Sequence, residues 1–121
     1  MAAKRVLIVE DQREVAESLR ICLELAGFDT KTAYSGPDGL ALALEWLPDF
    51  VLCDIGLPGG LDGWELATKL RQTACTKQSR LIAINAYGSD QDLARSRVAG
   101  FERHFTKPVD PAILVELLGS T

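Results

Sequence analysis

The sequence predicts a single α/β domain of five parallel strands that alternate with five helices. Short apolar runs bounded by turn residues alternate with segments of helical periodicity, and one run, Phe50–Cys53, is apolar at every position. Alternating strands and helices form a parallel sheet with helices on both faces, and a strand covered on both faces is uniformly apolar. The 121 residues suffice for one such domain, 1–121, and leave little room for a second.

The elements can be assigned in chain order. The predicted strands are residues 5–9, 28–33, 50–53, 81–84 and a fifth that contains His104 and Phe105. The predicted helices are residues 12–26, a segment that begins at Ser35-Gly36-Pro37-Asp38, residues 63–74, a segment from an N-cap at Ser89 to Gly100, and a segment that begins at Asp110-Pro111. The second strand is the weakest in apolar character, which predicts an edge position.

Helical spacing also predicts which residues face the core. The expected buried positions are Val15, Leu19, Cys22, Leu23 and Ala26 in the first helix, Leu40, Leu44 and Leu47 in the second, and Ile113, Leu114, Leu117 and Leu118 in the last.

Composition and charge argue against several classes of function. Hydrophobic residues make up 47% and charged residues 25% of the chain, and its net charge of -4 argues against direct nucleic-acid binding. No apolar run approaches the roughly 20 residues that span a bilayer. We therefore expect a cytoplasmic protein without a cleaved signal or a membrane anchor. Cys22, Cys53 and Cys75 are unclustered, which favours reduced thiols over a zinc site.

The candidate site consists of polar residues at the ends of the predicted strands. Ligands of open parallel sheets bind outside the carboxyl ends of the strands, and those ends carry Glu10-Asp11, Asp54, Asn85 and Lys107. Three crowded carboxylates repel one another unless a cation neutralises them, and Mg²⁺ prefers oxygen ligands. We expect Asp11 and Asp54 to bind Mg²⁺ directly and Glu10 to act through water.

The lysine adds the second part of a phosphoryl-transfer site. A lysine ammonium can pair with Asp54 at rest and with a phosphoryl oxygen after reaction, and Pro108 forces a turn directly after Lys107. Phosphoryl transfer depends mainly on positioning and charge neutralisation, so a carboxylate nucleophile beside Mg²⁺ and lysine needs no further base. The expected product is an aspartyl phosphate on Asp54.

Together these segments closely resemble the response-regulator receiver domain. The similarity rests on Glu10-Asp11, Asp54-Ile55-Gly56-Leu57-Pro58, Leu61-Asp62-Gly63-Trp64-Glu65-Leu66, Ala86-Tyr87-Gly88 and Thr106-Lys107-Pro108-Val109, and it covers essentially the whole chain. It implies a flavodoxin-like (βα)5 fold with strand order 2-1-3-4-5. It also implies phosphoryl transfer to Asp54 from a histidine kinase or a histidine phosphotransfer protein.

The resemblance assigns further roles. It makes the Gly56 carbonyl a third Mg²⁺ ligand and places Ala86 among the binding residues of the site. It implies that the fourth helix, fifth strand and fifth helix form a phosphorylation-sensitive surface for a downstream partner or a homodimer.

The chain departs from the family pattern after the fourth strand. Asn85 stands where the family usually has threonine or serine, and because an amide is longer and bulkier than a hydroxyl, we expect altered or weakened switching. Neither Gly56 nor Tyr87 carries a carboxylate or amide that could orient water, which predicts a phosphorylated state that is not short-lived. His104 occupies the usual position of a switching aromatic residue.

A second departure lies between Pro58 and Asp62, where Gly59-Gly60-Leu61 is one residue longer than the usual spacing. We expect this glycine to loosen the loop without affecting Mg²⁺ binding.

Other functions are compatible with parts of the pattern. Asn85 leaves open a protein-binding module of the same fold that does not depend on phosphorylation. Two classes of enzyme fit poorly, a flavodoxin-like redox protein and an aspartyl-phosphate phosphatase of the haloacid dehalogenase type. Asp54-Ile55-Gly56 lacks the second acid that such phosphatases use, and no glycine-rich phosphate loop follows the first strand. We therefore expect no catalysis beyond the domain's own phosphorylation and dephosphorylation.

Overall fold

A computed structural model describes residues 3–86 and 89–119, and within them it has the predicted five strands and five helices. The strands are β1 (Arg5–Val9), β2 (Asp29–Ala33), β3 (Phe50–Asp54), β4 (Arg80–Asn85) and β5 (Phe101–Thr106). The helices are α1 (Arg13–Leu25), α2 (Gly36–Trp46), α3 (Gly63–Gln72), α4 (Asp90–Ala99) and α5 (Pro111–Gly119). The sheet is parallel with the order β2-β1-β3-β4-β5, which confirms the flavodoxin-like topology.

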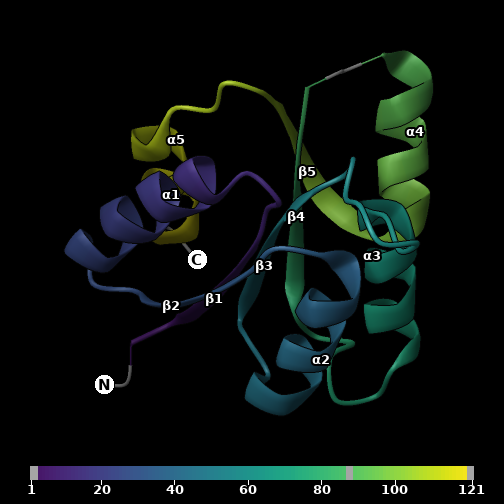
Figure 1. The fold of residues 1–121 in the computed structure, drawn as a ribbon, viewed down its shortest axis with the longest axis horizontal. Coiled ribbons are helices and arrows are strands. Elements are labelled where there is room, and N and C mark those ends of the chain that lie inside the picture. The colour runs from purple at the N-terminus through teal and green to yellow at the C-terminus, as the bar shows by residue number, and fades with distance from the viewer. Residues whose placement is uncertain (1–2, 87–88, 120–121) are drawn as a thin grey trace.

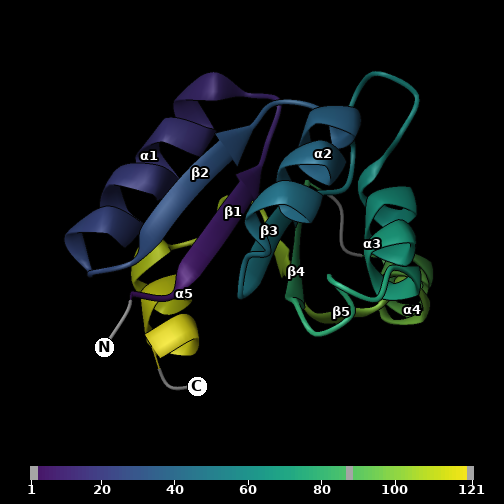
Figure 2. The same ribbon diagram turned by 90° about the horizontal axis from the view of Figure 1, so that it is seen from below.

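The molecule has three layers. α1 and α5 cover one face of the sheet, and α2, α3 and α4 cover the other (Figure 1, Figure 2). Each face has its own hydrophobic cluster, with Leu7 and Val51 on the side of α2 to α4 and Ile8 and Leu52 on the side of α1 and α5. Alternate residues of the same strands therefore belong to different clusters, as the pleat of a strand requires.

The strands differ in burial as their positions in the sheet require. Every residue of β3 is buried, whereas β2 is partly exposed along its length, which confirms its edge position. The register pairs Val9 with Cys53, Asp54 with Ile84 and Asn85 with Thr106. The carboxyl ends of β1, β3, β4 and β5 therefore finish close together along one edge.

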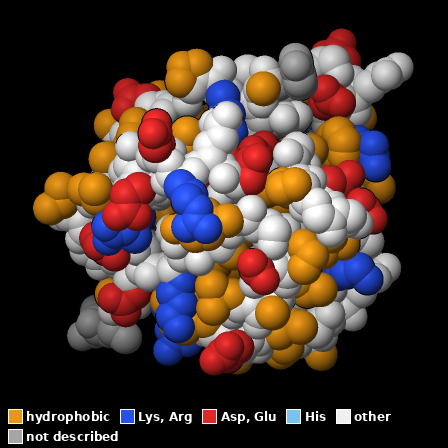
Figure 3. Space-filling view, in the orientation of Figure 1, with side chains coloured by type: hydrophobic (Ala, Val, Ile, Leu, Met, Phe, Trp, Pro, Cys, Tyr) orange, Lys and Arg blue, Asp and Glu red, His pale blue; other side chains and the backbone are white. Residues whose placement is uncertain are grey.

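The prediction of the buried face of α2 was correct only for Leu40, which is half-buried and packs against the core. Leu44 and Leu47 are 40% and 46% exposed, and the buried positions are Gly36, Gly39 and Ala43. A side chain at Gly39 would start 2.9 Å from a methyl group of Val9, so the small residues allow the helix backbone to approach the sheet closely. Leu44 and Leu47 are turned outward, whereas Leu40, Leu42 and Trp46 pack against the core. Hydrophobic groups reach the surface around α2 (Figure 3).

The other helices confirm most of the predicted core and correct part of it. Leu19 and Leu23 of α1 and Leu114 and Leu118 of α5 are buried, but Ile113 is 51% exposed. The remaining departures are minor: Val15, Cys22 and Leu117 are half-buried, Ala26 is exposed beyond the end of α1, and α3 ends at Gln72 rather than Ala74.

The predicted N-cap of α4 is confirmed, because Ser89 accepts a hydrogen bond from the amide of Asp92, and Gly100 is the C-cap that follows Ala99. Ser35 caps α2 in the same way by accepting from the amide of Asp38. The three cysteines are free thiols, and burial raises the pKa of Cys53 well above its ordinary value. Among the helices described, none is both long and apolar enough to cross a membrane.

Candidate functional site

Asp54 is the last residue of β3, and its carboxylate is held at both oxygens. Its Oδ1 accepts a hydrogen bond from the Gly56 amide at 3.2 Å, and its Oδ2 lies 3.1 Å from Nζ of Lys107. The residue is 8% exposed, so little of it is accessible to solvent. The pairing of Asp54 with Lys107 is the one expected of the resting site.

Glu10 follows β1 and is more deeply buried than Asp54. Only 3% of the residue is exposed, its Oε1 lies 2.5 Å from Nζ of Lys107, and its Oε2 accepts a hydrogen bond from the Gln12 amide at 3.0 Å. Burial raises the pKa of Glu10 to about 6, although the contacts with Lys107 and the Gln12 amide oppose the rise, and the charge of Asp54 adds to it. Ionisation of this carboxylate therefore costs more than in water, and further positive charge nearby would favour the ionised form.

Asp11 completes a cluster of three acids. One oxygen of Glu10, one of Asp11 and one of Asp54 lie within 4.8 Å of one another, and Asp11 is exposed at the mouth of the site. Lys107 offsets only one of the three negative charges that the ionised cluster carries. Hard oxygen donors with an excess of negative charge suit a divalent cation such as Mg²⁺, so the residues present fit the ion that the sequence implies.

Lys107 follows β5 and is held by its backbone as well as its side chain. Its amide donates a hydrogen bond to the Asn85 carbonyl at 2.7 Å, and the Lys107–Pro108 peptide bond is cis. Burial alone would lower the pKa of Lys107, but the bonds to Glu10 and Asp54 outweigh it and raise the pKa. The ammonium group is therefore a stable positive charge between the two carboxylates.

Asn85 ends β4 beside Lys107 and is 8% exposed. Its Oδ1 accepts a hydrogen bond from the Ala86 amide at 2.9 Å, which leaves the NH₂ group as the half of the amide that can donate to a ligand. Tyr87, to which the lifetime prediction refers, lies outside the described residues.

The structure brings the predicted residues together at one edge of the sheet. Glu10, Asp54 and Lys107 are directly bonded, and Asn85 and Ala86 adjoin them through the Lys107 backbone. The contact between Lys107 and Glu10 was not predicted. Glu10 comes directly after a strand of four buried residues, and this position could have indicated a carboxylate that needs a buried cation.

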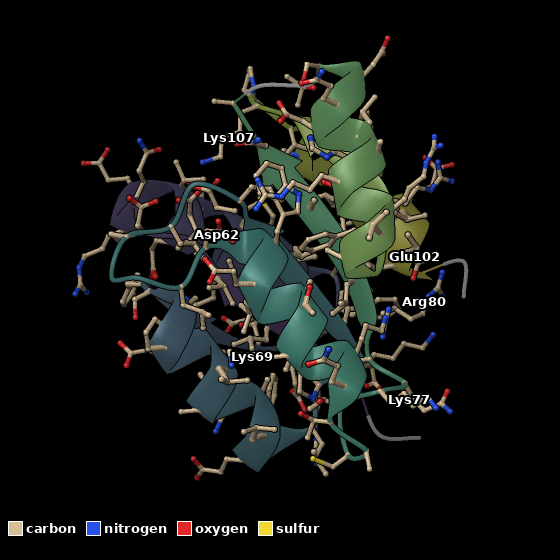
Figure 4. The ribbon with its side chains drawn as sticks, turned by 90° about the vertical axis from the view of Figure 1, so that its right-hand side faces the viewer. Asp62, Lys69, Lys77, Arg80, Glu102 and Lys107 are labelled. Carbon is tan, nitrogen blue, oxygen red and sulfur yellow. The ribbon has the colours of Figure 1, made fainter. Side chains whose placement is uncertain are left out.

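The loop after Asp54 joins β3 to α3 and contains the additional glycine. Gly59 and Gly60 have φ angles of 88° and 84°, both in the region that favours glycine. The loop ends at Asp62, which forms a reciprocal capping box with Glu65 at the start of α3. Asp62 and Lys107 lie toward the same end of the molecule in Figure 4.

Gly63 fixes the distance between α3 and the end of β3, and Gly63→Ala tests this close approach. A side-chain carbon at residue 63 would start 2.6 Å from the Asp54 carbonyl oxygen and 2.7 Å from Cα of Ile55. Backbone atoms cannot move aside cheaply, so we expect a loss of about 1–3 kcal/mol in the free energy of unfolding. Urea denaturation measures it, with Gly119→Ala as the control because a side-chain carbon at residue 119 would meet no atom within 4 Å.

Equal effects of the two substitutions would show that α3 can shift away from β3 without cost. Because Gly63 is buried against the backbone that carries Asp54, such tolerance would also mean that the position of the carboxylate is not fixed by α3.

The fold and the site together define a flavodoxin-like (βα)5 domain with acids and a lysine at the carboxyl edge of its sheet. The profile of the response regulator receiver domain family matches residues 6–119. The chain therefore belongs to this family, and it is a receiver domain of the two-component response-regulator type.

Two relatives and one solved structure show the extent of the similarity. The chain is 33% identical over 106 residues to the DNA-binding dual master transcriptional regulator RpaA of Synechocystis sp. and 31% identical over 118 residues to the phosphate regulon transcriptional regulatory protein PhoB of Pseudomonas aeruginosa. These alignments cover 88% and 98% of this chain but 44% and 51% of the two relatives, so the chain spans about half their length. The crystal structure of a CheY-like receiver domain protein from Methanospirillum hungatei is similar with a TM-score of 0.90 at 30% identity, covering 98% of this chain and 92% of that one.

Proposed function

We propose that this receiver domain accepts a phosphoryl group on Asp54 from a phosphohistidine of a histidine kinase or a histidine phosphotransfer protein. An oxygen of the Asp54 carboxylate attacks phosphorus, the bond from phosphorus to the histidine nitrogen breaks, and its electron pair stays with the imidazole. The observation that carries the proposal is the carboxylate of Asp54, oriented by the Gly56 amide and by Lys107 beside two further acids.

Mg²⁺ is the cofactor of this proposal, and receiver domains typically bind it at an acidic pocket. Asp11 and Asp54 are its direct ligands, and the Gly56 carbonyl is the third protein ligand. Glu10, which is more deeply buried than Asp54, acts through water. When bound, the ion neutralises charge on the phosphoryl oxygens.

The remaining residues stabilise the transferred group. Lys107 pairs with a phosphoryl oxygen once Asp54 is phosphorylated, and the NH₂ group of Asn85 is a further donor at the edge of β4. The amide of Ala86 can become another donor if it exchanges its bond to Oδ1 of Asn85 for one to the phosphoryl group. These roles are supported by the contact of Lys107 with Asp54 and by the position of Asn85 beside Lys107. All of the proposed chemistry is confined to the domain's own modification.

The proposal is tested by incubating the protein with acetyl phosphate and Mg²⁺ and measuring its intact mass. We expect one phosphoryl adduct on the wild type and on the control Asp38→Asn, which replaces an exposed acid of α2, and none on Asp54→Ala or in the presence of EDTA. An adduct that persists in Asp54→Ala would mean that the acceptor is a different residue. Absence of an adduct from every variant would favour a binding module that functions without phosphorylation.

The output of the domain is a protein partner or a second copy that binds through α4, β5 and α5, and direct binding of nucleic acid is not part of this proposal. The chain forms one receiver domain over residues 1–121, on its own or within a larger regulator. Exchange of phosphoryl groups with a kinase supports a cytoplasmic location.

A further inference from the structure

A buried hydroxyl on α4 connects three elements of the structure. Ser96 is 1% exposed, and its Oγ accepts a hydrogen bond from the indole N–H of Trp64 on α3 at 3.0 Å. The same oxygen lies 2.9 Å from Nδ1 of His104 on β5. An indole N–H can only donate, so the Ser96 hydroxyl has both a lone pair and its own proton for the bond with His104. One oxygen atom therefore joins α3, α4 and β5.

The rest of α4 offers little to hold it in place. Its buried residues are Ser96 and Ala99, and Val98 is 90% exposed. Because small side chains bury little apolar area, the hydrophobic contribution to the docking of this helix is small. Arg95 stacks on Trp64 with its guanidinium carbon 4.0 Å from the ring centroid, which keeps the indole under α4. The carbonyl of Gly100, at the end of α4, accepts a hydrogen bond from Arg71 of α3 at 3.0 Å. In the middle of α4, the hydroxyl of Ser96 therefore makes the main buried polar contact with α3 and β5.

The bond with His104 joins two elements of the proposed output surface, α4 and β5. His104 pairs with Ala83 on β4, two residues before Asn85, and α4 begins shortly after the same strand. A hollow of about 270 Å³ lies between α4 and β5, and both Ser96 and His104 line it. The imidazole therefore has space to turn away from Ser96 without displacing the core.

We propose that Trp64, Ser96 and His104 form a latch that holds α4 against α3 and β5 in the unphosphorylated protein. Movement of α4 on β5 requires the bond between Ser96 and His104 to open. The latch itself follows from the contacts alone, whereas its opening on phosphorylation rests on the proposed function.

Amide hydrogen exchange of the unphosphorylated, metal-free protein tests the latch. In Ser96→Ala we expect the amides of α4 to exchange about fivefold faster, as the loss of one hydrogen bond predicts. The matched control is Ser79→Ala. Ser79 is 5% exposed and its hydroxyl donates a hydrogen bond to the Pro48 carbonyl at 2.7 Å, so this substitution removes a buried hydrogen bond outside the latch. If both variants change exchange in α4 equally, the proposal is overturned.

A second variant keeps the test independent of the folding of Ser96→Ala. Trp64→Phe retains a ring beneath Arg95 but removes the N–H, and we expect it to accelerate exchange in α4 in the same direction. The bonds from Trp64 and to His104 both use Oγ of Ser96. In the double variant, Trp64→Phe with Ser96→Ala, we therefore expect the amides of α4 to exchange no faster than in Ser96→Ala alone. Multiplicative effects of the two substitutions would contradict a shared latch.

Beryllium trifluoride with Mg²⁺, a phosphoryl mimic, tests the opening. In the wild type we expect binding of the mimic to raise the exchange rate of the α4 amides toward the rate seen in Ser96→Ala. In Ser96→Ala itself, we expect the mimic to change the exchange rate of these amides by less than about twofold. If acetyl phosphate forms an adduct on Asp54 but the mimic leaves α4 unchanged in the wild type, the opening step is wrong. If no adduct forms, the proposed function fails, and the resting rates still decide whether the latch exists.

Discussion

Replacing Lys107 with methionine is expected to lower the free energy of unfolding of the metal-free protein by about 2–3 kcal/mol at neutral pH. Nζ of Lys107 lies 2.5 Å from Oε1 of Glu10 and 3.1 Å from Oδ2 of Asp54. Glu10 and Asp54 are 3% and 8% exposed. Methionine retains an apolar stem but leaves two buried carboxylates without their cation. The expected loss is below that of a fully buried pair because the Lys107 side chain is 20% exposed, so water screens part of the interaction.

The loss is expected to depend on pH. Burial raises the pKa of Glu10 to about 6 from an ordinary value of 4.5, and removal of Lys107 raises it further because that contact opposes the shift. A carboxyl group whose pKa is raised by folding favours the folded state fully below its unfolded pKa, and this contribution is lost as pH rises through the folded pKa. The destabilisation caused by Lys107→Met is therefore larger at about pH 7.5 than at about pH 5.

Urea denaturation in EDTA at the two pH values measures this effect. Lys77→Met is the matched control, because Lys77 is exposed and lies toward the opposite end of the molecule from Lys107 (Figure 4). We expect it to change stability by no more than about 0.5 kcal/mol. Equal losses in the two variants, or a loss in Lys107→Met that is the same at both pH values, would show that the lysine does not offset buried charge.

Leu114→Ala is expected to lower the free energy of unfolding by about 2–5 kcal/mol, whereas Ile113→Ala is expected to lower it by less than about 1 kcal/mol. Leu114 is fully buried in the cluster between the sheet, α1 and α5, and its neighbour Ile113 is 51% exposed. The lost methyl groups of Leu114 would leave a cavity, while those of Ile113 are already partly in water.

Urea denaturation of both variants checks this pair, and each serves as the control for the other because they remove similar volumes from adjacent positions of one helix. Similar losses would mean that α5 lies on the sheet at a different rotation, with both residues in the core.

The strands and the acidic site could be predicted because their signals are local. An apolar run such as Phe50–Cys53 identifies a covered strand, and parallel strands bring their ends to one edge, so Asp54 and Lys107 meet although they are far apart in the chain. The sequence also showed that Glu10 belongs to that edge. It did not show that Glu10 is the more deeply buried partner of Lys107, because burial depends on how the surrounding elements pack in three dimensions.

Helix rotation was harder to predict because it depends on the surface beneath each helix. In α2 the apolar stripe of leucines suggested the core face, but Gly39 and Ala43 pack on the sheet because they allow a closer approach. Ser96 was missed for a related reason: a serine in a polar helix gives no apolar signal. Its spacing from Leu93 and Ala99, three residues on either side, is the pattern that could have identified the inner face of α4.

Gly59 and Gly60 bear on how mutational scans of this domain should be read. Both are exposed, yet each has a positive φ angle, and other residues adopt that conformation at a cost of roughly 1–2 kcal/mol. A scan for retained function would therefore score two solvent-facing positions as intolerant, next to the proposed phosphorylation site. Intolerance there would report backbone geometry rather than a docking surface, and asparagine, the residue that best tolerates this conformation after glycine, would be the substitution that separates the two causes.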